Sequence, residues 1–346
     1  MSQVVRRSVS FGSFGRDFDS LSAWNSSLTN ANYAPGSIAC AVLYNDAIFD
    51  EHGLVITAES NIKGLLITAA EDNWHKGDTS QGVLFQPSVS HGPIISMSYS
   101  GPWRIERLRF NSNGLYSTNF SGILRQETSV NTAYPHMNWI DKCIITGGTS
   151  NNPARAMCGI HAKVRPMRVT NSLLYNILSN GSATSTVAFG IGGDDKLEIY
   201  NCTLDNVEFA NANGITYGLL GQSTANSFFG NNLVLRTQPG SSTAEDVSAI
   251  SARSNNGSSD ATGDIPNLVH TDEFANPAGG DYSLKAGASS EGAGFNGWCW
   301  DTLRYDITGD QRKDQAFDLG AYNNLSGYIS GGGGGGTITK FVPLGD

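Results

Sequence analysis

The sequence predicts an all-β fold, a single-stranded right-handed parallel β-helix in which the chain coils around a narrow apolar core. The first observation is a repeat within residues 137–235. Asp141, Asn171, Asn201 and Asn231 are each 30 residues apart (171 − 141, 201 − 171 and 231 − 201). The second observation is that two apolar columns accompany them: Trp139, Val169, Ile199 and Phe229, and Ile144, Leu174, Leu204 and Val234. A period shared by three columns is typical of a repeat architecture rather than of one compact core.

The residue types within each repeat predict strands. Apolar and polar residues alternate at a period of two, and many of the apolar ones are β-branched or aromatic. A second set of segments falls between the first: Cys158-Gly159-Ile160, Phe189-Gly190-Ile191, Gly214-Ile215-Thr216 and Ser248-Ala249-Ile250. Each coil therefore contains at least two strands. Coils about 4.8 Å apart would stack the Asx residues, and we expect Asp141, Asn171, Asn201 and Asn231 to form a hydrogen-bonded ladder along the axis.

Composition agrees with a chain made of strands and tight corners. The 346 residues include 41 glycines, and 22 basic against 31 acidic residues give a net charge of −9. An acidic protein is a poor nucleic-acid binder. The five cysteines show no metal-ligand spacing, so we expect buried free thiols and neither a metal nor another cofactor. The sequence has no apolar signal region and no run of 18 apolar residues, which predicts cytoplasmic assembly without membrane insertion.

Both ends of the chain differ from the repeats. Residues 1–18 lack periodicity, and this pattern predicts an arm that is ordered only against a partner. Residues 19–36 predict a capping helix, with Asp19 or Ser20 as N-cap, that plugs the open end and leads into the first coil. Residues 37–264 form the predicted β-helix, and residues 265–326 form its closing segment.

Residues 327–346 are a Gly-rich tail that includes six consecutive glycines, 331–336. Such a tract costs much conformational entropy to order and cannot pack a core. The segment after it is prone to form a strand, which predicts contact with a neighbouring subunit through Gly331, Gly336, Thr337 and Phe341. We expect a homo-oligomer, a trimer, bound to other proteins of a larger particle.

Two stretches carry a resemblance to known proteins. The series Asp281-Tyr282-Ser283-Leu284, Asp306-Ile307-Thr308-Gly309-Asp310-Gln311-Arg312 and Asp318-Leu319-Gly320-Ala321-Tyr322 resembles the closing segment of right-handed β-helix repeat proteins. The resemblance implies that Arg312 and Asp318 pair across the terminal turn. The segments Asp19-Ser20-Leu21-Ser22-Ala23-Trp24 and Asn73-Trp74-His75-Lys76-Gly77 resemble the start of β-helical proteins common in bacteriophage genomes. Because this fold serves both enzymes and structural proteins, the resemblance is specific for fold alone.

The sequence contains four carboxylates that are candidate catalytic groups. Polysaccharide hydrolysis needs two carboxyl groups facing one groove, and the candidates are Asp194, Asp195, Asp205 and Glu208. Asp194 and Asp195 precede Lys196 in a predicted turn, and Asp205 aligns with Tyr175 and Leu235. Glu198 aligns with Arg168 and predicts a surface ion pair. The segment Asn138-Trp139-Ile140-Asp141-Lys142 resembles a short motif of pectate lyases, but Lys142 replaces the usual His. His136 and His161 are isolated.

Three functions follow from these patterns. The first is a structural protein of a bacteriophage particle, a capsid decoration, spike or fibre subunit exposed on the virion, which stabilises the particle or contacts host surface glycans. The second is a β-helix tailspike module that binds or cleaves polysaccharide as a hydrolase or lyase, which needs two facing acids or an aromatic-lined groove. The third, a bacterial adhesin, lacks an export signal.

Overall fold

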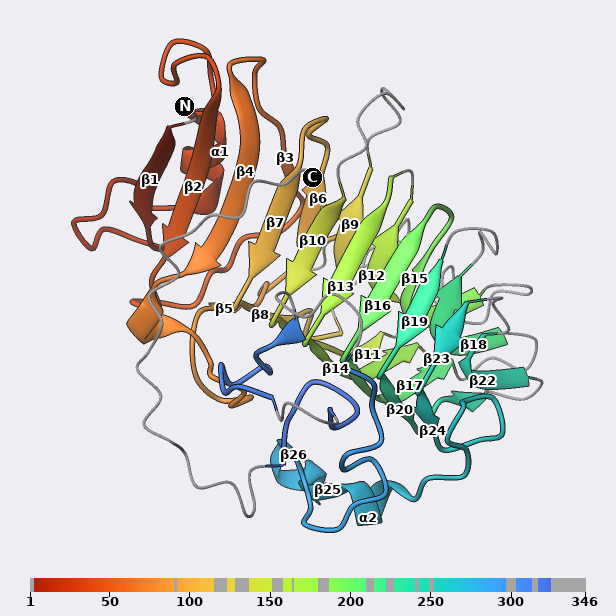
Figure 1. The fold of residues 1–346 in the computed structure, drawn as a ribbon. Helices are drawn as coiled ribbons and strands as arrows, with labels where there is room; N and C mark the ends of the chain where they lie inside the picture. The colour runs from red at the N-terminus through yellow and green to blue at the C-terminus, as the bar shows by residue number, and fades with distance from the viewer. Residues whose placement is uncertain are drawn as a thin grey trace.

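The computed structural model is a parallel β-helix built from three long sheets (Figure 1). It describes residues 3–89, 92–114, 123–127, 137–150, 158–163, 165–179, 187–209, 215–221, 227–239, 243–248, 252–296, 303–312 and 317–324. Each complete coil contributes one strand to each sheet, and the strands of successive coils pair in parallel. The fold class predicted from the sequence is thus confirmed, while the right-handed sense of winding stays a prediction.

The three sheets follow one another along each coil. The first contains β1 Val4–Val9, β2 Ser37–Leu43, β4 Ile62–Ala69, β7 Trp103–Glu106, β10 Asn138–Asp141, β13 Met167–Thr170, β16 Leu197–Tyr200, β19 Phe228–Gly230 and β23 Arg253–Ser254. The second contains β5 Leu84–Phe85, β8 Arg109–Asn111, β11 Ile144–Ser150, β14 Leu173–Ser179, β17 Thr203–Phe209, β20 Leu233–Leu235 and β24 Gly257–Ser258, with β21 Gln238–Pro239 beside β17. The third contains β3 Leu54–Ile56, β6 Ile95–Met97, β9 Leu124–Gln126, β12 Cys158–Ala162, β15 Val187–Gly193, β18 Ile215–Gly221 and β22 Thr243–Val247.

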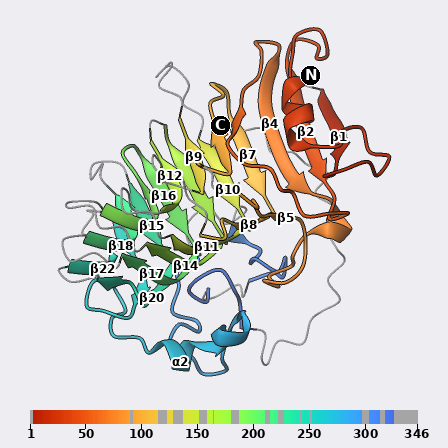
Figure 2. The same cartoon turned by 180° about the vertical axis from the view of Figure 1, so that it is seen from behind.

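The N-terminal residues belong to the solenoid. Val4–Val9 forms β1, which pairs in parallel with β2 from Val4–Ile38 to Val9–Leu43. The sequence instead predicts an arm ordered by a partner, because two Arg residues interrupt the alternation of this segment. On an outermost strand those side chains are free to face solvent. Helix α1, Leu21–Ser26, lies at the same end of the solenoid (Figure 2).

The predicted N-terminal helix is present and spans Leu21–Ser26. The Ser20 hydroxyl accepts a hydrogen bond from Ala23 N at 3.0 Å and is the N-cap. The first two N–H groups of the helix, those of Leu21 and Ser22, donate hydrogen bonds to the carboxylate of Glu51, both at 2.8 Å. Leu21 and Trp24 are fully buried in the core of the solenoid. The helix thus covers apolar side chains that the first coil would otherwise expose.

The interior column of the first sheet differs by one residue from the predicted one. Val169, Ile199 and Phe229 stack inside as predicted, but Ile140 precedes them, because β10 pairs Ile140 with Val169 and Trp139 with Arg168. Ile145, rather than Ile144, likewise precedes Leu174, Leu204 and Val234. Toward the N-terminal end this second column continues as the stacked rings of Phe110, Phe85 and Phe49, with centroids 5.2 and 4.7 Å apart.

The segments predicted between the repeats form the third sheet in part. Cys158 pairs with Phe189, and Ile160 pairs with Ile191, as the sequence predicts. The next two coils are shifted, because Leu219 and then Val247 occupy the column of Ile191. Gly214 and Ile250, which the prediction used, lie outside the described residues. The registers differ because the loops before these strands differ in length.

The closing segment covers the outer face of the second sheet instead of adding further coils (Figures 1 and 2). It contains α2 His270–Glu273, the antiparallel pair β25 Phe274–Asn276 and β26 Asp281–Leu284, and the 3-10 helix η2 Pro277–Gly279. A second 3-10 helix, η1 Glu71–Asn73, follows β4. Leu268, Phe274, Tyr282 and Leu319 of the closing segment pack on Leu173, Leu233 and Leu235 of the sheet. The part of the second sheet that contains these leucines is therefore buried on both faces.

Candidate functional site

The corner between the first and second sheets carries the predicted Asn column. Asn171, Asn201 and Asn231 have positive φ angles of 47°, 51° and 56°, in the left-handed region that Asn tolerates. Lys142, at φ 52°, holds the preceding place, and Asp141 lies one residue earlier, at the end of β10 and opposite Thr170. Asp141 is therefore not a member of this column. The correction arises because Lys142 and Asn171 are 29 residues apart (171 − 142), one fewer than the period.

The amide ladder predicted for this column does not form between successive Asn side chains. Asn171 donates to Asp141 Oδ1 at 3.1 Å and accepts from Arg312 Nη2 at 3.1 Å. Asn231 exchanges two hydrogen bonds with the main chain of Phe295, at 2.7 and 2.8 Å. The fully buried amide of Asn201 has no hydrogen-bond partner among the described residues. Asn171 and Asn231, on either side of Asn201 in the column, thus bind the closing segment.

Amide-to-amide bonds join two other pairs of Asn residues, which the sequence analysis missed. Asn206 donates to Asn176 Oδ1 at 2.8 Å, and both residues have positive φ. Asn232 donates to Asn256 Oδ1 at 2.9 Å inside the solenoid. The signal was present in the sequence, because Asn176 and Asn206 repeat the 30-residue period (206 − 176).

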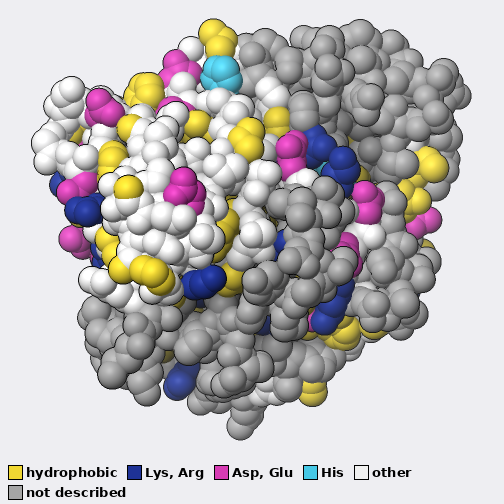
Figure 3. Space-filling view, turned by 90° about the horizontal axis from the view of Figure 1, so that it is seen from above, with side chains coloured by type: hydrophobic (Ala, Val, Ile, Leu, Met, Phe, Trp, Pro, Cys, Tyr) yellow, Lys and Arg dark blue, Asp and Glu magenta, His cyan; other side chains and the backbone are white. Residues whose placement is uncertain are grey.

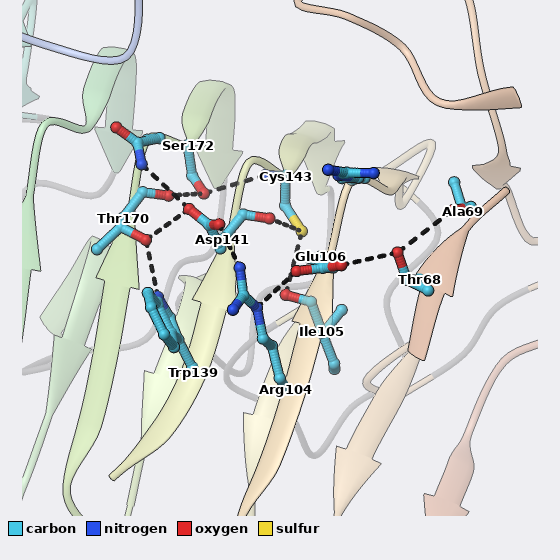
Figure 4. A network of polar contacts seen from close by, with 12 residues as sticks. Thr68, Ala69, Arg104, Ile105, Glu106, Trp139, Asp141, Cys143, Thr170 and Ser172 are labelled. Carbon is cyan, nitrogen blue, oxygen red and sulfur yellow. Dashed lines mark hydrogen bonds and ion pairs between the residues drawn. The ribbon is translucent and has the colours of Figure 1, made fainter. Parts of the chain in front are cut away.

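A network of polar side chains crosses the outer face of the first sheet (Figure 4). Thr68, Glu106, Asp141 and Thr170 lie side by side on β4, β7, β10 and β13. Thr68 donates to Glu106 at 3.0 Å, and Thr170 donates to Asp141 at 2.6 Å. Between the two carboxylates, Arg104 Nε lies 2.6 Å from Glu106 Oε2, and Arg104 Nη2 lies 2.7 Å from Asp141 Oδ2. One guanidinium group thus joins two acids from neighbouring coils.

A second row of side chains runs beside the first, two residues earlier in each strand. The half-buried ring of Trp139 has the guanidinium carbon of Arg104 4.1 Å from its centroid and that of Arg168 at 5.7 Å. Trp139 also donates through Nε1 to Thr170 at 2.8 Å. Such cation–π contacts contribute about 0.5–2 kcal/mol each, depending on how far water is excluded. The two rows are therefore connected through Arg104 and Trp139.

The predicted pairing of Glu198 with Arg168 is confirmed. Arg168 Nη2 lies 2.6 Å from Glu198 Oε2, and Lys196 Nζ lies 2.8 Å from Oε1. Burial raises the pKa of the Glu198 carboxyl group, but the hydrogen bond from Lys196 and the charge of Arg168 outweigh burial, so the pKa lies below its ordinary value. Glu198 therefore stays ionised and paired at neutral pH.

The sequence-predicted catalytic candidates are not brought together. Asp194 and Asp195 lie in the turn between β15 and β16, where Asp194 is exposed and Asp195 accepts from Lys196 N at 2.6 Å. Glu208 lies on β17 of the second sheet, between Leu178 and Gln238. His161 packs edge-on against Phe189, with ring centroids 5.4 Å apart. His136 lies outside the described residues.

Asp205 lies opposite Tyr175 and Leu235, as predicted, but its partners were missed. The side chain is fully buried and accepts hydrogen bonds from Arg236, from the Tyr282 hydroxyl at 3.2 Å and from His270 Nε2, which lies 3.3 Å away. Burial and the adjacent Asp205 charge raise the pKa of Tyr282 far above its ordinary value. This cluster joins α2 and β26 to the second sheet.

Arg312 provides the second anchor of the closing segment. Its fully buried guanidinium group donates to the main-chain oxygens of Asp318, Gly320 and Ala321, at 3.3, 2.9 and 3.1 Å. The implied contact with Asp318 thus runs through the Asp318 carbonyl group. The Asp318 carboxylate accepts from Gly292 N at 2.7 Å and Asn324 N at 2.5 Å.

Three further predictions concern thiols, metals and assembly. Cys40, Cys143, Cys158 and Cys202 are free and buried, as predicted, and Cys299 lies outside the described residues. Within the described ranges, no group of three or more His, Cys, Asp or Glu side chains is placed to hold a metal ion, and no helix is long and apolar enough to cross a membrane. The predicted assembly residues Gly331, Gly336, Thr337 and Phe341 lie outside the described residues.

No protein-family model matches this chain, and no curated protein matches it significantly. The architecture and the polar network of the first sheet therefore carry the functional argument.

Proposed function

We propose that this protein is a non-catalytic structural subunit of a bacteriophage particle, exposed on the virion surface as a decoration, spike or fibre subunit. The observation that carries the proposal is the pairing of charges across the outer face of the first sheet. Arg104 engages Glu106 and Asp141, and Arg168 engages Glu198. The Arg104–Asp141 and Arg168–Glu198 pairs join side chains of neighbouring coils and favour a stiff rod, which a structural subunit requires.

The state of the two adjacent acids favours this role over catalysis. A glycosidase needs one carboxyl group that can donate a proton and a second that can reach the sugar. The side chains of Glu106 and Asp141 are only 10% and 5% exposed, and both bind Arg104. Removing either acid would leave a largely buried guanidinium group undercompensated, so their best-supported role is cohesion between coils.

The surface charge is consistent with a subunit that stays soluble before assembly. Acidic and basic side chains are interspersed on the described part of the face seen from above (Figure 3). The net charge of −9 would keep free subunits apart. Assembly in the host cytoplasm, homotrimer formation and contact with other virion proteins belong to the same proposal.

A second candidate function, binding or cleavage of host surface polysaccharide, is favoured by one observation. Glu106, Asp141 and the half-buried Trp139 lie together on the outer face of one sheet, and aromatic rings and carboxylates are the groups that hold sugars. In this reading Trp139 contacts the glycan and the two acids perform the reaction as a hydrolase or lyase.

Polysaccharide assays separate the two candidates. Purified protein is incubated with surface polysaccharide from the host, and product size, new reducing ends and unsaturated sugars are measured. We expect no cleavage by the wild type. Cleavage that disappears in a folded Glu106→Gln or Asp141→Asn variant would establish the enzyme. Cleavage lost in Asp194→Asn or Glu208→Gln would place the catalytic groups at the positions predicted from sequence.

Particle composition tests the structural proposal itself. Phage particles produced by the host that carries this sequence are purified by density gradient, and antibodies against the recombinant protein are applied to intact particles. We expect gold label on the particle surface and the protein's peptides in the particle fraction. A protein found only in the soluble lysate would contradict the proposal.

A further inference from the structure

The outermost strand of the first sheet has an edge that is open over half its length. Ile38 N donates to Gln3 O at 2.9 Å, and Tyr44 N donates to Val9 O at 3.0 Å, so the odd-numbered residues of β1 direct their main-chain groups toward β2. Neighbouring residues of a strand direct these groups to opposite sides. Val4, Arg6 and Ser8 therefore direct theirs away from the solenoid.

Only the second half of this edge is covered. Ser8 donates through its main-chain N to Asp17 Oδ2 at 2.7 Å, and its carbonyl oxygen accepts from Phe18 N at 3.1 Å. The main-chain groups of Val4 and Arg6 have no partner among the described residues. Val4 is 38% exposed, and Phe14, in the loop that follows β1, is 50% exposed. An open strand edge beside exposed apolar side chains is a template for another strand.

We propose that residues 337–342 from a neighbouring copy of this chain pair with β1 along Val4–Arg6. The inference rests on the proposed role as an oligomeric subunit and names the contact that forms the oligomer. The segment reads Thr337-Ile338-Thr339-Lys340-Phe341-Val342, in which five of six residues are β-branched or aromatic. Residues 325–336 precede it, and a chain of this length reaches at most about 40 Å.

The charges of β1 favour this partner over a second copy of β1. Arg6 and Arg7 are both exposed, so two β1 strands placed side by side would bring like charges together, which destabilises a strand pair. The tail segment carries one basic residue, Lys340. A contact from tail to edge is heterologous: each copy gives one strand and receives one, and a closed ring of three copies satisfies every edge.

Proline substitutions test the contact because they remove a single main-chain donor. The Arg6 N–H group faces the open edge, so Arg6→Pro leaves the bonds between β1 and β2 intact. The Arg7 N–H group faces β2, so Arg7→Pro is the matched control. We expect wild-type protein to sediment as a trimer. Arg6→Pro and deletion of residues 331–346 should each give monomers with an unchanged melting temperature, whereas Arg7→Pro should lower that temperature.

Several outcomes would overturn the inference. A monomeric wild type would mean that no neighbouring copy occupies the edge. If the oligomer persists after the deletion but is lost in Arg6→Pro, the edge of β1 binds a segment other than the tail. If the oligomer persists in Arg6→Pro but is lost after the deletion, the tail binds a surface other than this edge. In each of these cases, particles that still contain the protein would preserve the proposed function and reject only this contact.

Discussion

Arg236 holds Asp205 in a two-point ion pair on the outer face of the second sheet. Arg236 Nε donates to Oδ1 at 2.7 Å and Nη2 donates to Oδ2 at 2.5 Å, and the Asp205 side chain is fully buried. His270 and Tyr282, from the closing segment, contact the same carboxylate. Arg236 therefore balances the charge of the buried Asp205, and Asp205 in turn binds His270 and Tyr282 of the closing segment.

We expect Asp205→Asn to destabilise the protein by about 2–3 kcal/mol. Breaking a buried pair costs about 3–5 kcal/mol, and the cost is smaller here because Arg236 is partly exposed. Urea unfolding measures the change, and limited proteolysis should show earlier cleavage between residues 262 and 284. The matched control is Asp272→Asn, at an exposed position of α2. Equal urea concentrations at the unfolding midpoint for the two variants would contradict the assigned role of Asp205.

Ile199→Asp should prevent stable folding. Ile199 is fully buried between Val169 and Phe229 in the interior column of the first sheet. An unpaired carboxylate there costs several kcal/mol, comparable to the whole stability of many domains. Ile199→Val, the control, should cost about 0.5–1.5 kcal/mol. Thermal unfolding followed by circular dichroism measures both, and a wild-type melting temperature for Ile199→Asp would refute the interior placement.

Acid should destabilise the protein through His75. This residue is buried, donates through Nε2 to Lys142 O at 2.7 Å and accepts from Gly77 N at 2.9 Å through Nδ1, so its ring is neutral. Burial lowers its pKa from 6.5 to about 3. Between these values the unfolded chain binds a proton that the folded chain does not, so stability is full above pH 6.5 and falls as the pH decreases toward 3.

The expected loss at pH 4.5 relative to pH 7 is about 2–3 kcal/mol from this residue. Urea unfolding at both pH values measures it in the wild type and in His75→Gln, which keeps one donor and one acceptor but does not titrate. We expect the variant to be less stable at pH 7 and to show a smaller pH dependence. A variant with the full wild-type pH dependence would exclude His75 as its source.

The described thiols should be unreactive in the folded protein. Burial raises the pKa of Cys40, Cys158 and Cys202 to about 12, and it raises that of Cys143 further. Because the thiolate is the reactive form, alkylation by iodoacetamide at pH 8 should modify these four residues only after denaturation. Peptide mass spectrometry identifies the modified residues. Rapid modification of Cys143 or Cys202 in native protein would contradict the packing of the corner.

Strict repetition made the central coils predictable. Val169, Ile199 and Phe229 were placed correctly because the 30-residue period holds for β13, β16 and β19. The coil before them has Lys142 at its corner instead of Asn, and the Asx residue that fits the 30-residue period, Asp141, lies one position earlier. A register error of one residue then placed Trp139 inside, although its indole lies in the polar network of the outer face.

Contacts distant in sequence were not predictable from the pattern. The partners of Asp205 lie 31, 65 and 77 residues away, and the two most distant, His270 and Tyr282, belong to the closing segment, which lacks the repeat. The network of Arg104, Glu106 and Asp141 depends on the register of β7 against β10, which the irregular spacing of the early coils concealed. Strand β1 was missed because its two arginines suit an outermost strand but interrupt the alternation that marks an interior one.

Electron cryomicroscopy of the native phage particle, at a resolution that shows side chains, tests the central claim most directly. The account predicts copies of a three-sheet parallel β-helix on the particle surface, with coils about 4.8 Å apart. Density for Trp139 beside Arg104 would identify this chain in the map. Particles that are complete and infectious but contain no such β-helix would contradict the claim that this protein is a structural subunit of the virion.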